Sequence, residues 1–215
     1  MNKKLIFIFI VLIIFVYFQY NYINKTNDSF NIVQYENPNK NIFENMVHEK
    51  SISIFTKIQF DFNNNINLDT YHLLNNKQLI NNIIKQNINY YNIPLCIKHN
   101  FTIENELIDY KTPLTIQNHY RGLIIQLKGE RKIYIFKQSD KKNLYFNKNN
   151  SSIDFWNQDI IKYPLVNKAQ YIEIILRENQ MIYIPYKFIY ASITLNNNLT
   201  AYSNSESLLS YFLKH

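Results

Sequence analysis

Short stretches in which apolar and polar positions alternate fill most of the chain after residue 50. The first of them, residues 51–62, is long enough to predict a strand with one buried face. Later apolar runs are short and rich in β-branched and aromatic residues, which is typical of strands. They cover residues 123–127, 132–136, 171–176, 181–184, 188–195 and 199–202. Many short strands with turns at close intervals predict a β-sandwich or barrel with helices packed outside.

Two pairs of these predicted strands are joined by short polar turns and are expected to form β-hairpins. The turn of the first pair contains Gly129, and that of the second contains Asn179, a residue type that tolerates positive φ. Pro185 cannot donate a backbone hydrogen bond, so it is expected to end the later pair. Leucine and isoleucine at spacings of three and four predict a helix over residues 73–91, and residues 94–97 and 143–146 are candidate short strands.

The N-terminus carries a strictly apolar run at residues 5–18, which extends with tyrosines to residue 23. The extended run has about the 20 residues of a spanning helix, and tyrosines suit the membrane interface. A cleaved signal peptide and a buried soluble helix are the alternatives, but no small-x-small cleavage site follows the run. Lys3 and Lys4 precede it, and the positive-inside tendency then predicts a single-pass membrane protein. Its N-terminus would be cytosolic and its remainder lumenal or external.

Composition divides the chain into three segments. Residues 1–23 form the expected membrane anchor. Residues 24–50 are polar, contain Pro38 and Asn-Lys pairs, and predict a linker. Residues 51–215 hold the predicted strands as one domain, since 215 residues with 47% hydrophobic content suffice for one sizeable core.

Several kinds of site are excluded by residue counts. The chain has two glycines, so a Gly-rich phosphate loop is absent. A single cysteine, Cys96, excludes an internal disulfide and a thiolate metal cluster. The net charge is +7, but the basic residues are scattered, and no nucleic-acid partner is expected.

Three segments together resemble the JmjC or cupin-like family: QLKGERKIYIF at 126–136, LYF at 144–146, and the stretch 151–192. Gln126 and Gly129 match the family's strand turn, and Asp159, Tyr163-Pro164 and Ile184-Pro185 match later steps in order. The resemblance implies a mainly β double-stranded β-helix, or jelly roll, with flanking helices. Most members of the family are iron(II) and 2-oxoglutarate-dependent oxygenases.

The iron ligands of that family are not found in this chain. The family uses a His-x-Asp step and a later histidine, a triad suited to oxygen activation. Thr115 with Gln117, or Ile116 with Asn118 after a one-residue shift, stands at the first two positions. Tyr190 replaces the third ligand. His119 is close in sequence to the first pair and is a candidate for a displaced ligand, although a lone histidine is more often structural.

The co-substrate side of the family pattern is better preserved. Members hold the distal carboxylate of 2-oxoglutarate with a basic residue just after the turn glycine, and Arg131 stands there. A guanidinium can bind a carboxylate in a bidentate manner, and Thr112 could add a hydroxyl. The simpler alternative is that Arg131 is a charge on a strand face.

The sequence favours a membrane-anchored pseudo-oxygenase that has lost iron, carries no cofactor, and binds a protein or a small anion. Residues 5–23 would supply its contact with the membrane. The alternative is an active oxygenase that uses Fe(II) and 2-oxoglutarate through non-standard ligands. A purely structural jelly roll is a third interpretation, since fold alone does not define function.

Overall fold

The computed structural model describes residues 3–25, 30–58, 96–207 and 210–212. The predicted helix over residues 73–91 lies outside these ranges, and of the candidate strand at 94–97 only the last two residues lie inside.

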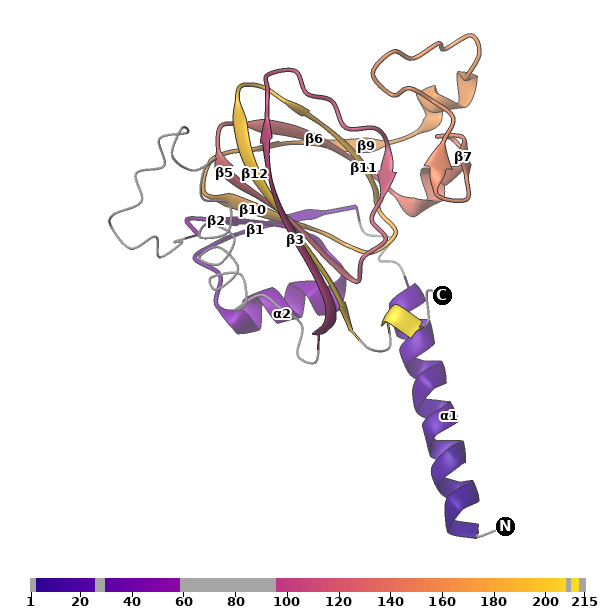
Figure 1. Cartoon of the computed structure of the whole chain (residues 1–215). Helices are drawn as coiled ribbons and strands as arrows, with labels where there is room; N and C mark the ends of the chain where they lie inside the picture. The colour runs from indigo at the N-terminus through magenta and orange to yellow at the C-terminus, as the bar shows by residue number, and fades with distance from the viewer. Residues whose placement is uncertain (1–2, 26–29, 59–95, 208–209, 213–215) are drawn as a thin grey trace.

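Within the described ranges, the strands form two main sheets that face each other (Figure 1). The larger has the order β1-β2-β10-β5-β12-β3 and the smaller the order β4-β11-β6-β9. The larger sheet contains β1 (Ile32–Glu36), β2 (Ile52–Thr56), β3 (Cys96–Glu106), β5 (Arg121–Lys128), β10 (Gln180–Ile184) and β12 (Asn198–Ser207). The smaller sheet contains β4 (Thr115–Ile116), β6 (Arg131–Phe136), β9 (Tyr171–Leu176) and β11 (Ile189–Thr194). The short pair β7 (Phe146–Asn147) and β8 (Asn150–Ser151) stands apart, and two 3-10 turns, η3 (Gln138–Lys141) and η4 (Pro164–Lys168), flank it.

The chain crosses between the two sheets at nearly every connection. From β3 to β6 successive strands alternate between the larger and the smaller sheet, and they alternate again from β9 to β12. Pairing is antiparallel throughout the two sheets except between β1 and β2. This winding is the double-stranded β-helix, so the predicted jelly-roll fold class is confirmed.

The two predicted hairpins are wrong. β5 pairs with β10 and β12, and its successor β6 pairs with β9 and β11 in the other sheet. β9 and β10 are likewise divided between the sheets. The turn residues do adopt the expected backbone, with φ of 81° at Gly129 and 61° at Asn179. These turns reverse the chain direction and also carry it across the barrel.

Buried apolar side chains form three clusters: one between the two sheets and one on the outer face of each sheet. The cluster between the sheets contains Ile124, Ile133, Ile135, Ile174, Leu176, Ile182, Ile184 and Phe188. A second lies on the outer face of the larger sheet beneath α2 (Lys40–Glu49), and includes Phe43 and Phe55. The third covers the outer face of the smaller sheet with aromatic residues of the 146–156 region.

The predicted linker, residues 24–50, contains β1 and α2. Asn39 caps the N-terminus of α2 by accepting the Ile42 N–H at 2.8 Å, and Lys50 ends it in the left-handed region at φ 55°. Phe43 is fully buried in the core. The segment is typical of a linker in sequence because its apolar residues are few and widely spaced. In the amphipathic helix α2, however, three buried residues, Phe43, Met46 and Val47, are enough to cover one face of the sheet.

At the N-terminus, α1 (Lys3–Asn24) projects from the barrel (Figure 1). It is long and apolar enough to cross a membrane. Nearly all of its apolar side chains are exposed, as Phe7 at 68% and Phe18 at 65% illustrate. A helix that is apolar on all sides and unburied is suited to lipid rather than to water.

The turn at Asn179 allows a test of the sheet crossing. We expect Asn179→Val to lower the free energy of unfolding by about 1–2 kcal/mol, because a β-branched residue is disfavoured at positive φ. Asn179→Gly should be neutral or slightly stabilising, and Glu178→Val, at an exposed neighbour, is the matched control. Urea denaturation of the full chain in detergent measures all three, and equal effects of the two valine variants would contradict the assigned turn.

Candidate functional site

Two short strands meet where the family pattern expects iron ligands. In the pairing of β4 with β11, Thr115 is the partner of Tyr190, and Ile116 is the partner of Ile189. Tyr190 packs against the cluster between the sheets, whereas both isoleucines belong to the cluster outside the smaller sheet. Side chains alternate along a strand, so Thr115 shares the inner face with Tyr190. Of the two alignments that the sequence leaves open, the one with Thr115 and Gln117 follows this inner face.

Gln117 is 4% exposed, and its side chain holds local structure. Its amide lies over Gly122 of β5 so closely that a Cβ on that glycine would overlap it. Its Oε1 accepts the backbone N–H of His119 at 3.0 Å, and its backbone pairs with Lys187 and Phe188 of the loop between β10 and β11 at 2.8 Å each. Asn118, from the other alignment, is exposed.

The side chains at these positions do not fit ferrous iron. Burial raises the pKa of the Tyr190 phenol, although Arg131 opposes the shift, so the phenol is neutral at physiological pH. A threonine hydroxyl, an amide and a neutral phenol supply neither imidazole nitrogen nor anionic oxygen. Non-haem iron sites of the family type need two imidazoles and a carboxylate. The inner face of β4 and β11 therefore brings the matched positions Thr115 and Tyr190 together without the family's ligand chemistry.

Arg131 and Thr112 are brought together through Ser192 of β11. Arg131 is fully buried inside the barrel, and its Nη1 donates to Ser192 Oγ at 2.8 Å. The Thr112 hydroxyl lies 3.1 Å from the same Oγ and accepts the Ser192 N–H at 2.8 Å. The alternative interpretation of Arg131 as a charge on an exposed strand face does not agree with this burial.

Arg131 also has an internal carboxylate partner that sequence reasoning missed. Its Nη2 forms an ion pair with Glu106 Oε2, and Glu106 is only 4% exposed. Tyr202 donates its hydroxyl to the other oxygen of Glu106 at 3.1 Å, and Thr200 lies within 3.4 Å of Oε2. Burial lowers the pKa of Arg131, and its Nε has no hydrogen-bond partner. The guanidinium is thus held by carboxylate and hydroxyl groups of its own chain.

The sequence around Glu106 has a strand pattern, but the pattern predicts that the glutamate faces solvent, whereas it is buried. Along β3, Phe101 and Ile103 alternate with Thr102, Glu104 and Glu106, which predicts a solvent-facing polar side. The apolar side packs against the cluster beneath α2, and on the polar side Thr102 and Glu104 are exposed, whereas Glu106 is buried in the barrel. Alternation predicts the two faces of a strand, but it does not show that one polar side chain on such a face pairs with a buried charge inside the barrel.

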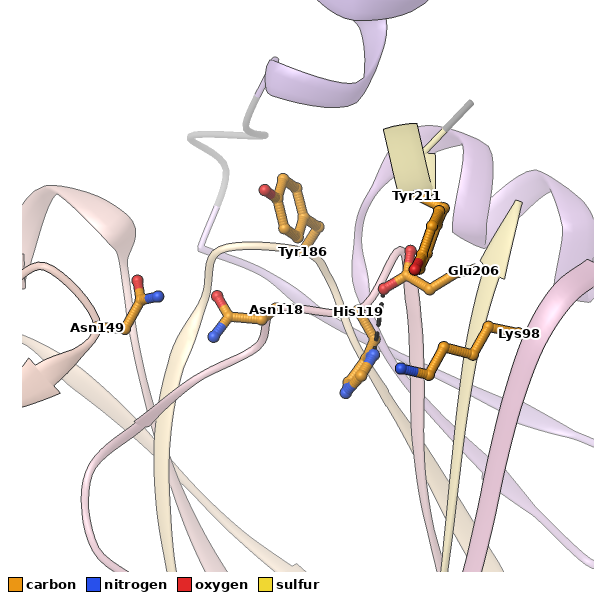
Figure 2. A pocket seen from close by; sticks show the side chains of 7 residues that line it. All are labelled: Lys98, Asn118, His119, Asn149, Tyr186, Glu206 and Tyr211. Atoms are coloured by element: carbon orange, nitrogen blue, oxygen red, sulfur yellow. Dashed lines mark hydrogen bonds and ion pairs between the residues drawn. The ribbon is translucent and has the colours of Figure 1, made fainter. Parts of the chain in front are cut away.

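A cavity of about 450 Å³ lies beside the ends of β3 and β12, and Figure 2 shows its lining side chains. It is lined by Lys98, Asn118, His119, Asn149, Tyr186, Glu206 and Tyr211. In Figure 2, Lys98, His119 and Glu206 lie together, with Asn118 and Asn149 across from them. We refer to this cavity as the mouth pocket. A second hollow of about 380 Å³ adjoins it along β4 and the β7–β8 turn.

In the mouth pocket, His119 pairs with a carboxylate. Its Nδ1 lies 3.1 Å from Glu206 Oε1. The other oxygen of Glu206 accepts the Ser210 hydroxyl at 2.7 Å and the Tyr120 N–H at 3.4 Å. Among the described residues, no group of three or more His, Cys, Asp or Glu side chains could hold a metal ion. The displaced-ligand interpretation of His119 therefore lacks further ligands within this part of the chain.

Comparison with known proteins agrees with the winding of the strands. The family model described as "Cupin-like domain" matches residues 19–202. JmjC domain-containing protein D of Dictyostelium discoideum is 34% identical to this chain over 83 residues. The match covers 34% of this chain and 18% of that protein, so the two share only a small part of the relative's length. With a family model that spans most of the chain and a barrel of the same type, this protein belongs to the JmjC-type cupin-like domain family.

Proposed function

We propose that this protein is a membrane-anchored, non-catalytic cupin-like domain that binds a ligand or a partner at the mouth of its barrel. The observation that carries the proposal is the buried ion pair of Arg131 with Glu106. In the family, the basic residue at this position holds the distal carboxylate of 2-oxoglutarate. In this chain, the guanidinium of Arg131 is instead paired with the carboxylate of Glu106 from β3 of the same domain.

Displacing Glu106 would be costly for an incoming dicarboxylate. Breaking a buried pair leaves an uncompensated charge and costs about 3–5 kcal/mol. The incoming carboxylate would also approach the negative charge of Glu106, which is only 4% exposed and therefore poorly screened by solvent. The position that serves co-substrate binding in active relatives therefore favours a structural role in this chain.

The substituted ligand positions support the same proposal. Thr115, Gln117 and Tyr190 offer neutral donors, and the amide of Gln117 is already engaged over Gly122. Such a neutral donor set does not suit an iron-dependent oxygenase. We infer that the domain retains the barrel as a scaffold for binding.

The membrane anchoring is proposed from α1. Its apolar side chains are exposed around the whole helix, and its length matches a bilayer. Its last turn is hydrogen-bonded to the domain, where Tyr22 donates to His48, which favours a retained anchor over a cleaved signal peptide. Lys3 and Lys4 favour a cytosolic N-terminus, with the barrel on the lumenal or external side.

Iron binding and turnover test the loss of catalysis. The full chain, purified in detergent, is expected to bind no stoichiometric Fe(II) under anaerobic titration and to release no succinate from 2-oxoglutarate. The triple variant Thr115→His/Gln117→Asp/Tyr190→His restores the family's donor types and should gain Fe(II) affinity over the natural chain. Stoichiometric iron together with succinate release by the natural chain would overturn the proposal.

Unfolding measurements test the structural role of Glu106. We expect Glu106→Gln to lower the free energy of unfolding by about 3–5 kcal/mol, because Arg131 is left as a buried, unpaired charge. Glu173→Gln is the matched control, since Glu173 pairs at 2.9 Å with the neighbouring Lys132 on an exposed face, where loss of the pair costs about 1 kcal/mol or less.

The double variant Arg131→Met/Glu106→Leu separates charge from packing. It should recover most of the stability that Glu106→Gln loses, because replacing both partners with apolar groups leaves no unpaired charge. If Glu106→Gln is no more destabilising than Glu173→Gln, the ion pair does not hold the barrel in the way we describe.

A further inference from the structure

The last turn of α1 is fixed to the barrel by a buried lysine. Lys50 Nζ donates to the backbone carbonyl of Ile23 at 3.0 Å and also to those of Tyr22 and Lys25. The final carbonyls of a helix have no partner within the helix, so this ammonium caps them. Burial, with further effects of Lys187 and Lys25, lowers the pKa of Lys50 to about 8, which leaves it charged at neutral pH. The end of α1 is therefore part of the folded domain.

A second contact joins α1 to the loop between β10 and β11. Lys187 Nζ donates to Asn24 Oδ1 at 2.8 Å. The preceding residue, Tyr186, lines the mouth pocket, and its pKa is raised by burial and further by the nearby Glu206 and Tyr20 of α1. The mouth pocket thus adjoins the end of α1.

Helix length sets the height of this junction above the bilayer. α1 has 22 residues, or roughly 33 Å at a rise of about 1.5 Å per residue. A hydrocarbon core is about 30 Å thick, so a spanning α1 leaves almost no helix outside it. Since the last turn is already bonded to the domain, the barrel rests on the headgroup layer. The mouth pocket then lies at the level of the lipid headgroups.

Charges of both signs stand side by side in the wall of the pocket. Lys98 and Glu206 are direct partners in the antiparallel pairing of β3 with β12, so their side chains emerge on the same face. Glu206 is held in place by His119, Tyr120 and Ser210 and is 5% exposed. Amides and the rings of two tyrosines complete the lining. A cavity with one exposed cation, Lys98, one carboxylate held by hydrogen bonds, Glu206, and aromatic faces suits a zwitterion.

We propose that the mouth pocket binds the zwitterionic headgroup of a phospholipid, with its phosphate toward Lys98 and its ammonium toward Glu206 and the tyrosine rings. This inference rests on the proposed anchoring by α1. The phosphate receives a charge-assisted hydrogen bond from the lysine. The ammonium meets a carboxylate and aromatic faces, which attract cations. The volume of about 450 Å³ is within the range of small-molecule sites.

Native mass spectrometry of the full chain in detergent tests the proposal. Phosphatidylcholine, phosphatidylethanolamine and phosphatidylglycerol are each titrated, and the retained lipid is counted. We expect retention of the zwitterionic lipids and at least a tenfold loss of their apparent affinity in Lys98→Met and in Glu206→Gln. Lys132→Met and Glu173→Gln remove an equivalent pair outside the pocket and should bind like the natural chain.

Glu206 also holds Tyr120 and Ser210, so its variant is checked by thermal unfolding. Asn149 also lines the pocket but lies on the exposed β7–β8 turn, where its replacement should not affect folding. Asn149→Ala is therefore expected to lower the affinity for zwitterionic lipid without lowering stability. Equal retention of all three lipids, or no difference between pocket variants and controls, would overturn the inference. Stronger binding of phosphatidylglycerol would overturn the zwitterionic assignment.

Two further measurements separate the pocket from the anchor. Alkaline carbonate extraction of membranes that contain the chain reports whether α1 spans; release into the supernatant would refute the anchoring. Calorimetric titration with soluble phosphocholine and phosphoethanolamine then reports the pocket alone. If the protein is extracted by carbonate and still binds these soluble compounds, the ligand is not a membrane lipid. If the protein stays in the membrane but retains no zwitterionic lipid, only the assignment of the pocket is refuted.

Discussion

The ion pair between Arg131 and Glu106 connects the two sheets of the barrel from inside. Arg131 comes from β6 of the smaller sheet and Glu106 from β3 of the larger one. Ser192 and Thr200 extend the network into one further strand of each sheet. Such a network stabilises only when its members satisfy each other, because a half-satisfied group in a low-dielectric interior is costly. The polar network around Arg131 is thus a single unit within the barrel, and neither Arg131 nor Glu106 can bind another group without loss of the other's partner.

The positions of the strands could be predicted from the sequence, but their partners could not. Alternation and β-branched content located β6, β9 and β11 to within about a residue. The turns at Gly129 and Asn179 were also located, since their positive φ needs particular residue types. A turn residue determines local backbone direction, whereas the sheet that a strand joins depends on long-range pairing. The resemblance to a known family supplied that missing topology.

The candidate site shows the same division between local and long-range information. Family resemblance located Arg131, Thr115 and Tyr190, and the structure brings them to the barrel interior. It could not reveal Glu106, because that residue is 25 positions from Arg131 in sequence and belongs to an edge strand with an ambiguous polar face. Similarly, the sequence predicts a linker over residues 24–50, because the single short amphipathic helix within it carries few apolar residues. What determines the chemistry of Arg131 is a contact between distant segments, and such contacts leave no local pattern.

The rigid junction at Lys50 affects how tightly the mouth pocket must bind its ligand. A domain on a flexible tether samples many orientations, and its pocket meets the bilayer only part of the time. In the proposed anchoring, α1 is capped by Lys50 and held by Lys187, and the pocket would be fixed beside the headgroup layer, where lipid headgroups are present at high local concentration. An intrinsic affinity in the millimolar range, about −4 kcal/mol, is then enough for occupancy. One cation, one anion and two aromatic rings are sufficient for such an affinity, and a deep, apolar cavity is not needed.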